Sequence, residues 1–321
     1  MILILSIDGD LSTDVVINWL KFYGHPYIRL NPLEIVEKKV FFSLKEQILI
    51  IGDKTIKIDE INAIWNRKIG FFSYTPQFKL LVESSGYDVA EQILRENASI
   101  VSGFVRLFKD KKWLLNALST NINKIDVLNM AFKIGLDIPE TFILSNKLDI
   151  KNIHAKTPLI SKSVYEVIFL KRLNGLYSMY TNRLSEVFFK KVPDDFFPSL
   201  LQVEVKKMYE IRTFFLIDTC YSMSIFSQKS KQTELDFRRY EWANPNRFIP
   251  YKLPREIEMK IKKLMKSLNL NTGSIDFMRG EDGKYYFLEI NPAGQFGMID
   301  FSCNYGLHKK VAQTLIKFDN G

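Results

Sequence analysis

Cysteine and histidine are scarce in this chain of 321 residues, which holds two cysteines and three histidines. Cys220 and Cys303 lie far apart and no metal-ligand spacing joins them, so the sequence excludes a disulfide framework and a Cys/His zinc site. No run of about 18 apolar residues is present for a membrane span, and Met1 to Ser6 is too short for a signal peptide. We therefore expect a cytoplasmic protein with no membrane partner.

Acidic residues are fewer than basic residues: 36 Asp and Glu stand against 45 Lys and Arg, a net charge of +9. An acidic partner such as a nucleotide or an acidic peptide fits this charge, and so does a genome that favours lysine codons. The basic residues are scattered and form no single tail, so we expect no nucleic-acid partner. The content of 46% hydrophobic residues is that of a globular protein, and the length predicts two or three domains.

The first part of the sequence alternates strand and helix patterns. MILILSI predicts a strand, residues 12–14 suit the N-terminus of a helix that ends at Gly24, and PYIRLN predicts a second strand. This β-α-β opening lacks the Gly-x-Gly-x-x-Gly turn of dinucleotide-binding proteins. Further strands are predicted in KVFFSL, QILIIG and KTIKIDEINAIWNRKI, and a long helix or a pair of helices from residue 89 to about residue 116.

A polar break at STNINK begins the second part. Asn123 is expected to cap a helix that starts at Lys124 and ends at Gly135. Short β-like runs follow in ETFILS, PLISKSV, EVIFLK and GLYSMYT, and PSLLQVEVKKMYEIRTFFLID predicts two strands joined by a charged turn. An amphipathic helix is predicted over residues 254 to 268, and GSIDFMRGEDGKYYFLEINP predicts a hairpin with Gly283 in its turn.

The stretch YFLEINPAGQF ends the second strand of this hairpin with oxygen-bearing side chains. Glu289 and Asn291 are two residues apart, so in a strand their side chains point to the same face. Asp276 on the neighbouring strand adds a third oxygen donor, and such a set suits a hard cation such as Mg2+. A solvated strand end that pairs with Lys or Arg would show the same residues, and Glu-x-Asn-Pro alone does not separate the two interpretations.

The order of further motifs resembles the ATP-grasp ligases. GSID (273–276) and LEINP (288–292) are similar to the magnesium-binding end of that family, in which the Asp, Glu and Asn hold two Mg2+ ions on the triphosphate of ATP. The resemblance therefore implies ATP and Mg2+ as cofactors, with Asp276, Glu289 and Asn291 as metal ligands. It implies nucleotide-binding lysines at Lys124 and Lys162, an adenine-binding hinge at Gln202, Val203, Glu204 and Val205, a ribose-binding acid at Glu210, a substrate- or phosphate-facing Arg212, and a triphosphate-binding Arg238.

Among ATP-grasp ligases the chain is similar to the graspetide synthetases, the microviridin-type peptide cyclases, and within them to the grasp-with-spasm peptide maturases. WNRK (65–68) resembles the Trp-Tyr-Arg-Arg signature of that group but departs from it at Asn66 and Lys68. KWLLN and NPAGQFGMIDFSCNYGL are also typical of the group. The resemblance implies a partner, namely a ribosomal precursor peptide with a leader and with a core rich in Thr or Ser and in Asp or Glu.

The implied reaction is ATP-dependent macrocyclisation of that peptide. A carboxylate is a poor acyl donor because its leaving group would be oxide, whereas transfer of the γ-phosphoryl group to an Asp or Glu side chain makes a reactive acyl phosphate. Attack by Ser or Thr gives an ω-ester, and attack by Lys gives an ω-amide. Catalysis is assigned to Arg212, Arg238 and Asn291. Arg212 would orient the carboxylate or stabilise the acyl phosphate, or else would form a salt bridge with Glu210 or Glu204.

Several alternatives stay open. The chain could be an ATP-grasp ligase that adds a free amino acid or amine to a peptide or small carboxylate, or a peptide-binding module without catalysis. Asp300 is a weak candidate for a general base. We expect the leader to contact a hairpin at about residues 166 to 181, although its aromatic side chains could instead only pack the small sheet. The number, topology and order of the rings stay open, as does the oligomeric state, a homodimer included.

We predict an α/β (α+β) chain with the ATP-grasp fold in three parts. Residues 1–120 would form an N-terminal α/β domain. Residues 121–198 would form a central lid domain with the leader-binding hairpin, and residues 199–321 a C-terminal catalytic domain with the hinge and the metal site.

Overall fold

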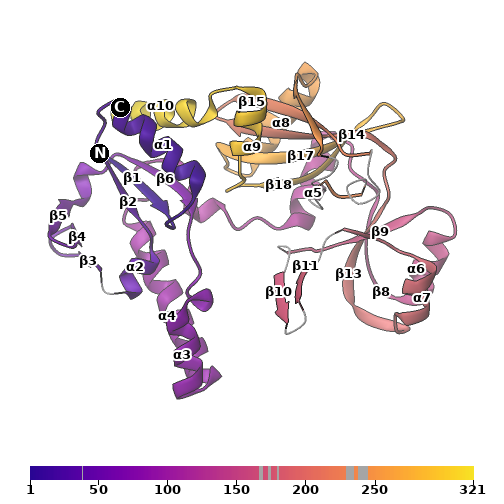
Figure 1. Cartoon of the computed structure of the whole chain (residues 1–321), viewed down its shortest axis with the longest axis horizontal. Helices are drawn as coiled ribbons and strands as arrows, with labels where there is room; N and C mark the ends of the chain where they lie inside the picture. Colours follow the sequence, from indigo (N-terminus) through magenta and orange to yellow (C-terminus); the bar gives the residue numbers. More distant parts are fainter. Residues whose placement is uncertain (38, 166–168, 173–174, 179–180, 229–234, 238–244) are drawn as a thin grey trace.

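A computed structural model gives the fold of the chain (Figure 1). The structure describes all residues except 38, 166–168, 173–174, 179–180, 229–234 and 238–244. The chain forms both α-helices and β-sheets, so the predicted mixture of α and β structure is confirmed. Among the described residues, no helix is both long and apolar enough to cross a membrane.

A four-stranded parallel sheet in the order β2-β1-β6-β7 forms the N-terminal part. Its strands are β1 (Ile2–Ser6), β2 (Tyr27–Leu30), β6 (Ala63–Lys68) and β7 (Lys112–Leu114), joined through helices α1 (Leu11–Phe22) and α2 (Leu33–Val36). The predicted β-α-β opening is confirmed, but α1 begins earlier than predicted. Asp10 is its N-cap and accepts a hydrogen bond from the backbone N–H of Thr13 at 3.0 Å, which explains the earlier start.

Three further strands and a pair of helices complete this part of the chain. The strands form a small antiparallel sheet of β3 (Val40–Ser43), β4 (Ile48–Ile51) and β5 (Lys54–Lys57). The helices α3 (Pro76–Ser85) and α4 (Tyr87–Arg106) form an arm that projects from the parallel sheet (Figure 1). The helix prediction is correct for α4 but wrong beyond it. Residues 112–114 form β7, because pairing with β6 buries Trp113 and Leu114.

The helix α5 (Lys124–Ile134) leads into the central sheet and has the caps that the sequence predicts. The Asn123 side chain accepts the N–H of Ile125 at 2.9 Å, and Gly135 ends the helix in the left-handed region at φ 91°. The central sheet follows the order β12-β9-β13-β8. It contains β8 (Thr141–Asn146), β9 (Leu159–Lys162), β12 (Asn182–Arg183) and β13 (Asp195–Val203), with α6 (Lys147–His154), α7 (Glu186–Lys191) and the hairpin of β10 (Phe169–Arg172) and β11 (Gly175–Ser178).

Two features of this central part were not predicted. The helices α6 and α7 pack on the sheet through Ile150 and Phe188, which join a buried cluster with Leu159 and Leu201. The strand β13 pairs with β8 and β9 up to Val203, so the sheet extends past the predicted division at residues 198 and 199. The division into domains itself stays a prediction.

A five-stranded antiparallel sheet in the order β16-β15-β14-β17-β18 forms the C-terminal part. Its elements are β14 (Lys207–Leu216), β15 (Thr219–Phe226), β16 (Arg247–Tyr251), β17 (Thr272–Gly280), β18 (Tyr285–Asn291), α8 (Arg255–Ser267), α9 (Gly297–Cys303) and α10 (Leu307–Asp319). Because side chains alternate along a strand, Phe215 packs with α5 and α8 on one face. Phe214 faces the other way, where α1 and α10 join the N-terminal and C-terminal parts in one core.

Candidate functional site

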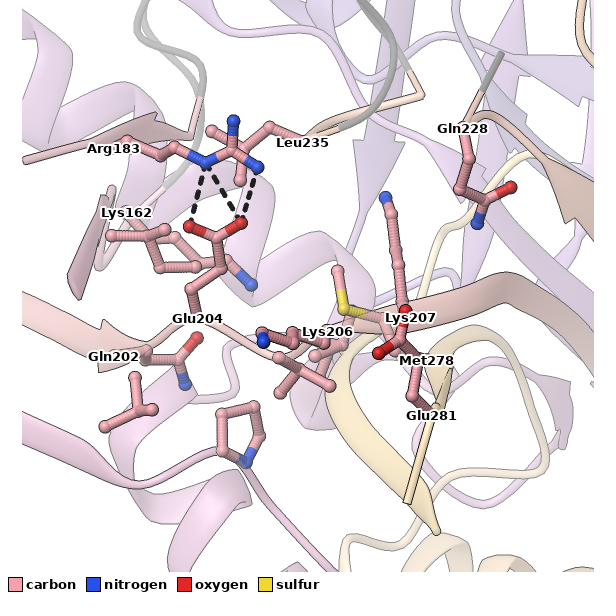
Figure 2. A pocket seen from close by; sticks show the side chains of 15 residues that line it. Lys162, Arg183, Gln202, Glu204, Lys206, Lys207, Gln228, Leu235, Met278 and Glu281 are labelled. Atoms are coloured by element: carbon pink, nitrogen blue, oxygen red, sulfur yellow. Dashed lines mark hydrogen bonds and ion pairs between the residues drawn. The ribbon is translucent and has the colours of Figure 1, made fainter. Parts of the chain in front are cut away.

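A cavity of about 480 Å³ lies where the central sheet meets the five-stranded sheet (Figure 2). Lys162 and all of the predicted hinge residues line it, so the structure brings these residues together. Its apolar wall includes Ile160, Met278 and Leu288, which come from β9, β17 and β18. A cavity of this size with an apolar wall and a few polar groups is typical of a site for a small molecule.

Two amide side chains present buried polar atoms at this cavity. Gln202 is 1% exposed, and its Nε2 donates a hydrogen bond to Thr141 Oγ1 at 2.9 Å. Its Oε1 is buried and has no hydrogen-bond partner among the described residues, and the same holds for Nε2 of Gln228. Burial of an unpaired polar atom is costly, so these atoms suit a ligand that supplies a donor and an acceptor next to an apolar surface.

Positive charge gathers around the same cavity. Lys162, Lys206 and Lys207 line it together with Arg183, whose guanidinium forms a forked pair with the Glu204 carboxylate at 2.6 and 2.8 Å (Figure 2). Because these basic groups outnumber the acidic side chains in the wall, the cavity favours an anionic ligand.

The buried carboxylate of Glu210 pairs with the ammonium group of Lys207. Ser227 Oγ also donates to it at 3.3 Å. Burial raises the pKa of Glu210, and the neighbouring lysine opposes this shift. Among the described residues that line the cavity, Lys207 is present and Glu210 is not. Sequence reasoning missed Lys207, because a Lys-Lys pair between two strands is typical of a solvated turn.

The predicted metal ligands come together on adjacent strands. Asp276 on β17 is the direct cross-strand partner of Glu289 on β18, and Asn291 follows on the same face. Arg212 Nη1 lies 3.5 Å from Asp276 Oδ2, and Lys124 Nζ lies 3.1 Å from Glu289 Oε2. The alternative partners considered for Arg212 are therefore wrong, because Glu210 pairs with Lys207 and Glu204 pairs with Arg183.

The chemistry of these donors fits a magnesium ion. Asp276, Glu289 and Asn291 supply only oxygen ligands, and both carboxylates keep some solvent access, with side chains 18% and 29% exposed. In the described part of the chain no group of three or more His, Cys, Asp or Glu side chains is placed to hold a metal ion. At Asp276 and Glu289 a third protein ligand would be the Asn291 amide. Lys124 also donates to the Ser163 carbonyl at 2.9 Å, which ties this acidic pair to the end of β9 beside Lys162.

Some predicted contacts cannot be placed among these groups. Arg238 lies outside the described residues, as do positions 166–168, 173–174 and 179–180 of the expected leader-binding segment. The hairpin itself is present, with Arg172 of β10 opposite Gly175 of β11. Its role in leader binding stays a prediction.

Asp300 belongs to a different part of the fold. Its buried carboxylate accepts the N–H groups of Leu307 and His308 at 2.6 and 3.0 Å and pairs with the His308 ring. These contacts cap the start of α10. These contacts account for the burial of Asp300, and its action as a general base stays a weak prediction. Cys303 is buried in the core.

The chain is similar over nearly its full length to solved structures of peptide-modifying enzymes. Macrocyclase MdnC from Microcystis aeruginosa MRC, bound with precursor peptide MdnA, is 23% identical with a TM-score of 0.80, and 99% of each chain is covered. A second solved structure is a Chryseobacterium gregarium RiPP-associated ATP-grasp ligase in complex with ADP and a leader and core peptide. It is 23% identical with a TM-score of 0.83, and the match covers 98% of this chain and 96% of the ligase chain. ATP-grasp ligase PsnB, complexed with minimal precursor, Mg and ADP, is 16% identical with a TM-score of 0.79, and 99% and 97% of the two chains are covered.

No protein-family model matches the chain, and no curated protein sequence matches it. The structural likenesses show that the chain has the ATP-grasp fold, which confirms the predicted fold class. A RimK domain ATP-grasp protein from Sphaerobacter thermophilus DSM 20745 shares this fold at 10% identity and a TM-score of 0.54.

Proposed function

We propose that this protein is an ATP-dependent macrocyclase that links Asp or Glu side chains of a ribosomal precursor peptide to its Ser or Thr hydroxyls. The observation that carries the proposal is the convergence of Asp276 and Glu289 with the cations of Lys124 and Arg212, beside a cationic cavity in an ATP-grasp fold. The fold neighbours solved with precursor peptides support a peptide as the substrate.

The cavity and the acidic pair would divide the binding of ATP. The adenine ring would lie against the apolar wall with its exocyclic amino group donating to Gln202 Oε1, and the phosphates would extend toward Lys162 and Lys124. Asp276 and Glu289, together with the Asn291 amide, would hold Mg2+, which when bound offsets the charge of the triphosphate.

The condensation needs two displacements. A peptide carboxylate oxygen attacks the γ-phosphorus, the bond to ADP breaks, and an acyl phosphate forms. A Ser or Thr oxygen then attacks the acyl carbon, the hydroxyl proton is lost, and inorganic phosphate leaves. The guanidinium of Arg212 forms an ion pair with Asp276 and therefore lies next to the proposed metal ligands. Its planar, charged fork would hold the peptide carboxylate and then the acyl phosphate.

The leader of the peptide would contact the β10–β11 hairpin of the central part, which would also act as the lid of the site. Ester links are proposed over amide links. Because the reaction consumes ATP and a newly made peptide, we place it in the cytoplasm.

We propose in addition that two copies of the chain associate. Leu80 and Tyr87 belong to the α3–α4 arm that projects from the N-terminal sheet, Tyr74 lies just before α3, and each of these side chains is more than half exposed (Figure 1). Contact between two arms would bury this apolar surface. Light scattering after size exclusion should give a dimer mass that falls to the monomer mass in Leu80→Glu. A monomeric wild type would contradict the homodimer.

Intact-mass spectrometry tests the function. The protein is incubated with Mg-ATP and a precursor peptide that has a leader and a Thr- and Glu-rich core, and each ring should lower the peptide mass by about 18 Da, the mass of the expelled water. Lability to base would identify esters. Asn291→Ala should give no mass loss.

Other outcomes of the same experiment would overturn the proposal. A mass gain would mean that a second molecule is ligated, as in an enzyme that adds a free amino acid or amine. The same conclusion would follow if free amino acids stimulate ATP consumption and a leader-bearing peptide does not. Wild-type protein that neither binds nor consumes ATP would indicate a peptide-binding module.

A further inference from the structure

A buried arginine of the N-terminal sheet reaches the loop that follows the candidate metal strand. Arg67 on β6 is 3% exposed, and its Nε lies 3.2 Å from Asp10 Oδ2. One of its terminal nitrogens donates a hydrogen bond to the carbonyl of Ala293. The other terminal nitrogen and Nε are buried without a hydrogen-bond partner among the described residues, so the contact with Asp10 is an ion pair. The guanidinium carbon lies 5.7 Å from the centre of the Phe296 ring.

The loop that Arg67 contacts is a tight turn that begins at a candidate metal ligand. The N–H of Gly294 donates to the carbonyl of Asn291 at 3.0 Å, and Ser274 Oγ donates to the carbonyl of Gln295 at 3.3 Å. A Cβ at Gly294 would stand 2.4 Å from Ser274 Cβ, so the turn packs directly on β17. The Asn291 backbone is therefore fixed from β17 on one side and, through Ala293, from Arg67 on the other.

The carboxylate with which Arg67 forms its ion pair is itself held in place. Asp10 Oδ2 accepts hydrogen bonds from the N–H and the hydroxyl of Thr13 at 3.0 and 2.7 Å, because Asp10 is the N-cap of α1. A buried carboxylate with these partners holds a guanidinium in one orientation. Arg67 thus connects the start of α1 to the end of β18, two segments that are far apart in the sequence.

We propose that Arg67 is a positioning residue for the metal site, which holds the turn after Asn291 so that the amide oxygen stays beside Asp276 and Glu289. This inference rests on the proposed function of those residues as magnesium ligands. Arg67 does not itself touch the ligand, since its side chain is buried between the two parts of the fold. Its effect passes through the backbone of Ala293.

A second arginine of the same sheet offers a matched control. Arg29 on β2 also pairs with a carboxylate, Asp14 Oδ1 at 2.6 Å, and also donates to a backbone carbonyl, that of Ile7. Within the part of the chain that the structure describes, Arg29 makes no hydrogen bond or ion pair with the turn after Asn291. The variants Arg67→Lys and Arg29→Lys therefore remove the same chemistry, and only the first acts at the metal site.

The test measures metal binding and not turnover. Mn2+ replaces Mg2+, and free Mn2+ is followed by electron paramagnetic resonance while it is titrated into the protein with ADP present. Loss of a group that orients a ligand typically weakens metal binding by about tenfold or more. We expect about a tenfold rise in the Mn2+ dissociation constant for Arg67→Lys, because one ammonium cannot reach both Asp10 and Ala293 in place of the fork. Arg29→Lys should leave the constant unchanged.

Gly294→Ala is a second variant in case Arg67→Lys does not fold. The added methyl group would force the turn away from Ser274, and weaker Mn2+ binding of similar size is expected. Equal Mn2+ binding by wild type, Arg67→Lys and Gly294→Ala would overturn the positioning role. Two other results would instead overturn the proposed metal site. The wild-type protein would bind no Mn2+ in the presence of ADP, or Asp276→Asn would bind Mn2+ as tightly as the wild type does.

Discussion

The ammonium of Lys124 lies 3.1 Å from the carboxylate of Glu289, although the first belongs to the start of α5 and the second to the end of β18. The Asn123 cap fixes the point at which α5 begins, and Lys124 also donates to the Ser163 carbonyl after β9. One cation thereby connects the acidic pair of the C-terminal sheet to the central sheet that carries Lys162. A triphosphate that passes between the two sheets would meet both lysines.

Replacement of Lys124 should separate activity from stability. In Lys124→Ala we expect ATP consumption to fall about 100-fold, the typical loss when one group that stabilises transition-state charge is removed. The free energy of unfolding should change by about 1 kcal/mol or less, since the ion pair is partly exposed. A coupled assay of ADP release and urea unfolding measure the two quantities.

Lys260→Ala serves as the control for Lys124→Ala. Lys260 pairs with Glu256 at 2.5 Å on the surface of α8, so its loss removes an ion pair without touching the site. Equal turnover in the two variants would contradict the assignment of Lys124.

Gln202 should contribute to adenine binding. Gln202→Met keeps the length of the side chain but removes the buried Oε1, so we expect about a three- to tenfold loss of ADP affinity, the range for one neutral hydrogen bond. Isothermal titration calorimetry measures it. Thr141→Val should act in the same direction, because the amide loses the partner that orients it. An unchanged ADP affinity in both variants would show that Gln202 does not contact the base.

Arg212 should act on the chemistry and not on nucleotide binding. Arg212→Lys keeps the positive charge but loses the planar fork, so we expect peptide condensation to slow about 100-fold while ADP affinity stays within about threefold. Single-turnover mass spectrometry and calorimetry compare the two. Arg279→Lys on the neighbouring strand β17 is the control, where the guanidinium lies 4.3 Å from the centre of the Tyr285 ring. A parallel loss of ADP affinity in Arg212→Lys would favour a nucleotide-binding role instead.

The Asp300 cap should make stability depend on acid pH. Burial alone would raise the pKa of Asp300, but hydrogen bonds from the His308 ring and from two backbone N–H groups outweigh it and hold the pKa below its usual value of 3.8. The folded state therefore binds this proton less tightly than the unfolded chain does. The stabilisation is complete above about pH 4 and is lost as the pH falls through the lowered pKa.

Denaturation of Asp300→Asn measures this contribution. Near neutral pH the variant should be less stable than wild type by about 1 to 3 kcal/mol, the range for hydrogen bonds to a buried charge. As the pH falls through the lowered pKa of Asp300 the difference should shrink, because the wild-type carboxyl then takes up a proton and loses its charge. A difference that stays constant from neutral to acid pH would mean that the charge of Asp300 does not contribute.

Local sequence determined the elements that carry the site. The Asn123 cap and the Gly135 terminator of α5 follow from short-range hydrogen bonding and from the left-handed backbone that glycine tolerates. The hairpin of β17 and β18, with Gly283 at φ 82° in its turn, follows from two strand patterns around a turn signal. The placement of Glu289 and Asn291 on one face follows from the two-residue period of a strand. These are properties of neighbouring residues, which a sequence displays directly.

Only the tertiary structure decided which distant groups meet. The pairing of β7 with β6, the ion pair of Lys124 with Glu289, and the contact of Arg67 with Ala293 each join segments whose approach depends on the packing of whole sheets. A bulge in β18 leaves Leu288 without a direct partner in the ladder to β17, and this residue lines the cavity. Side-chain contacts over long sequence separations arise from the sum of many weak packing interactions, and no local pattern records that sum.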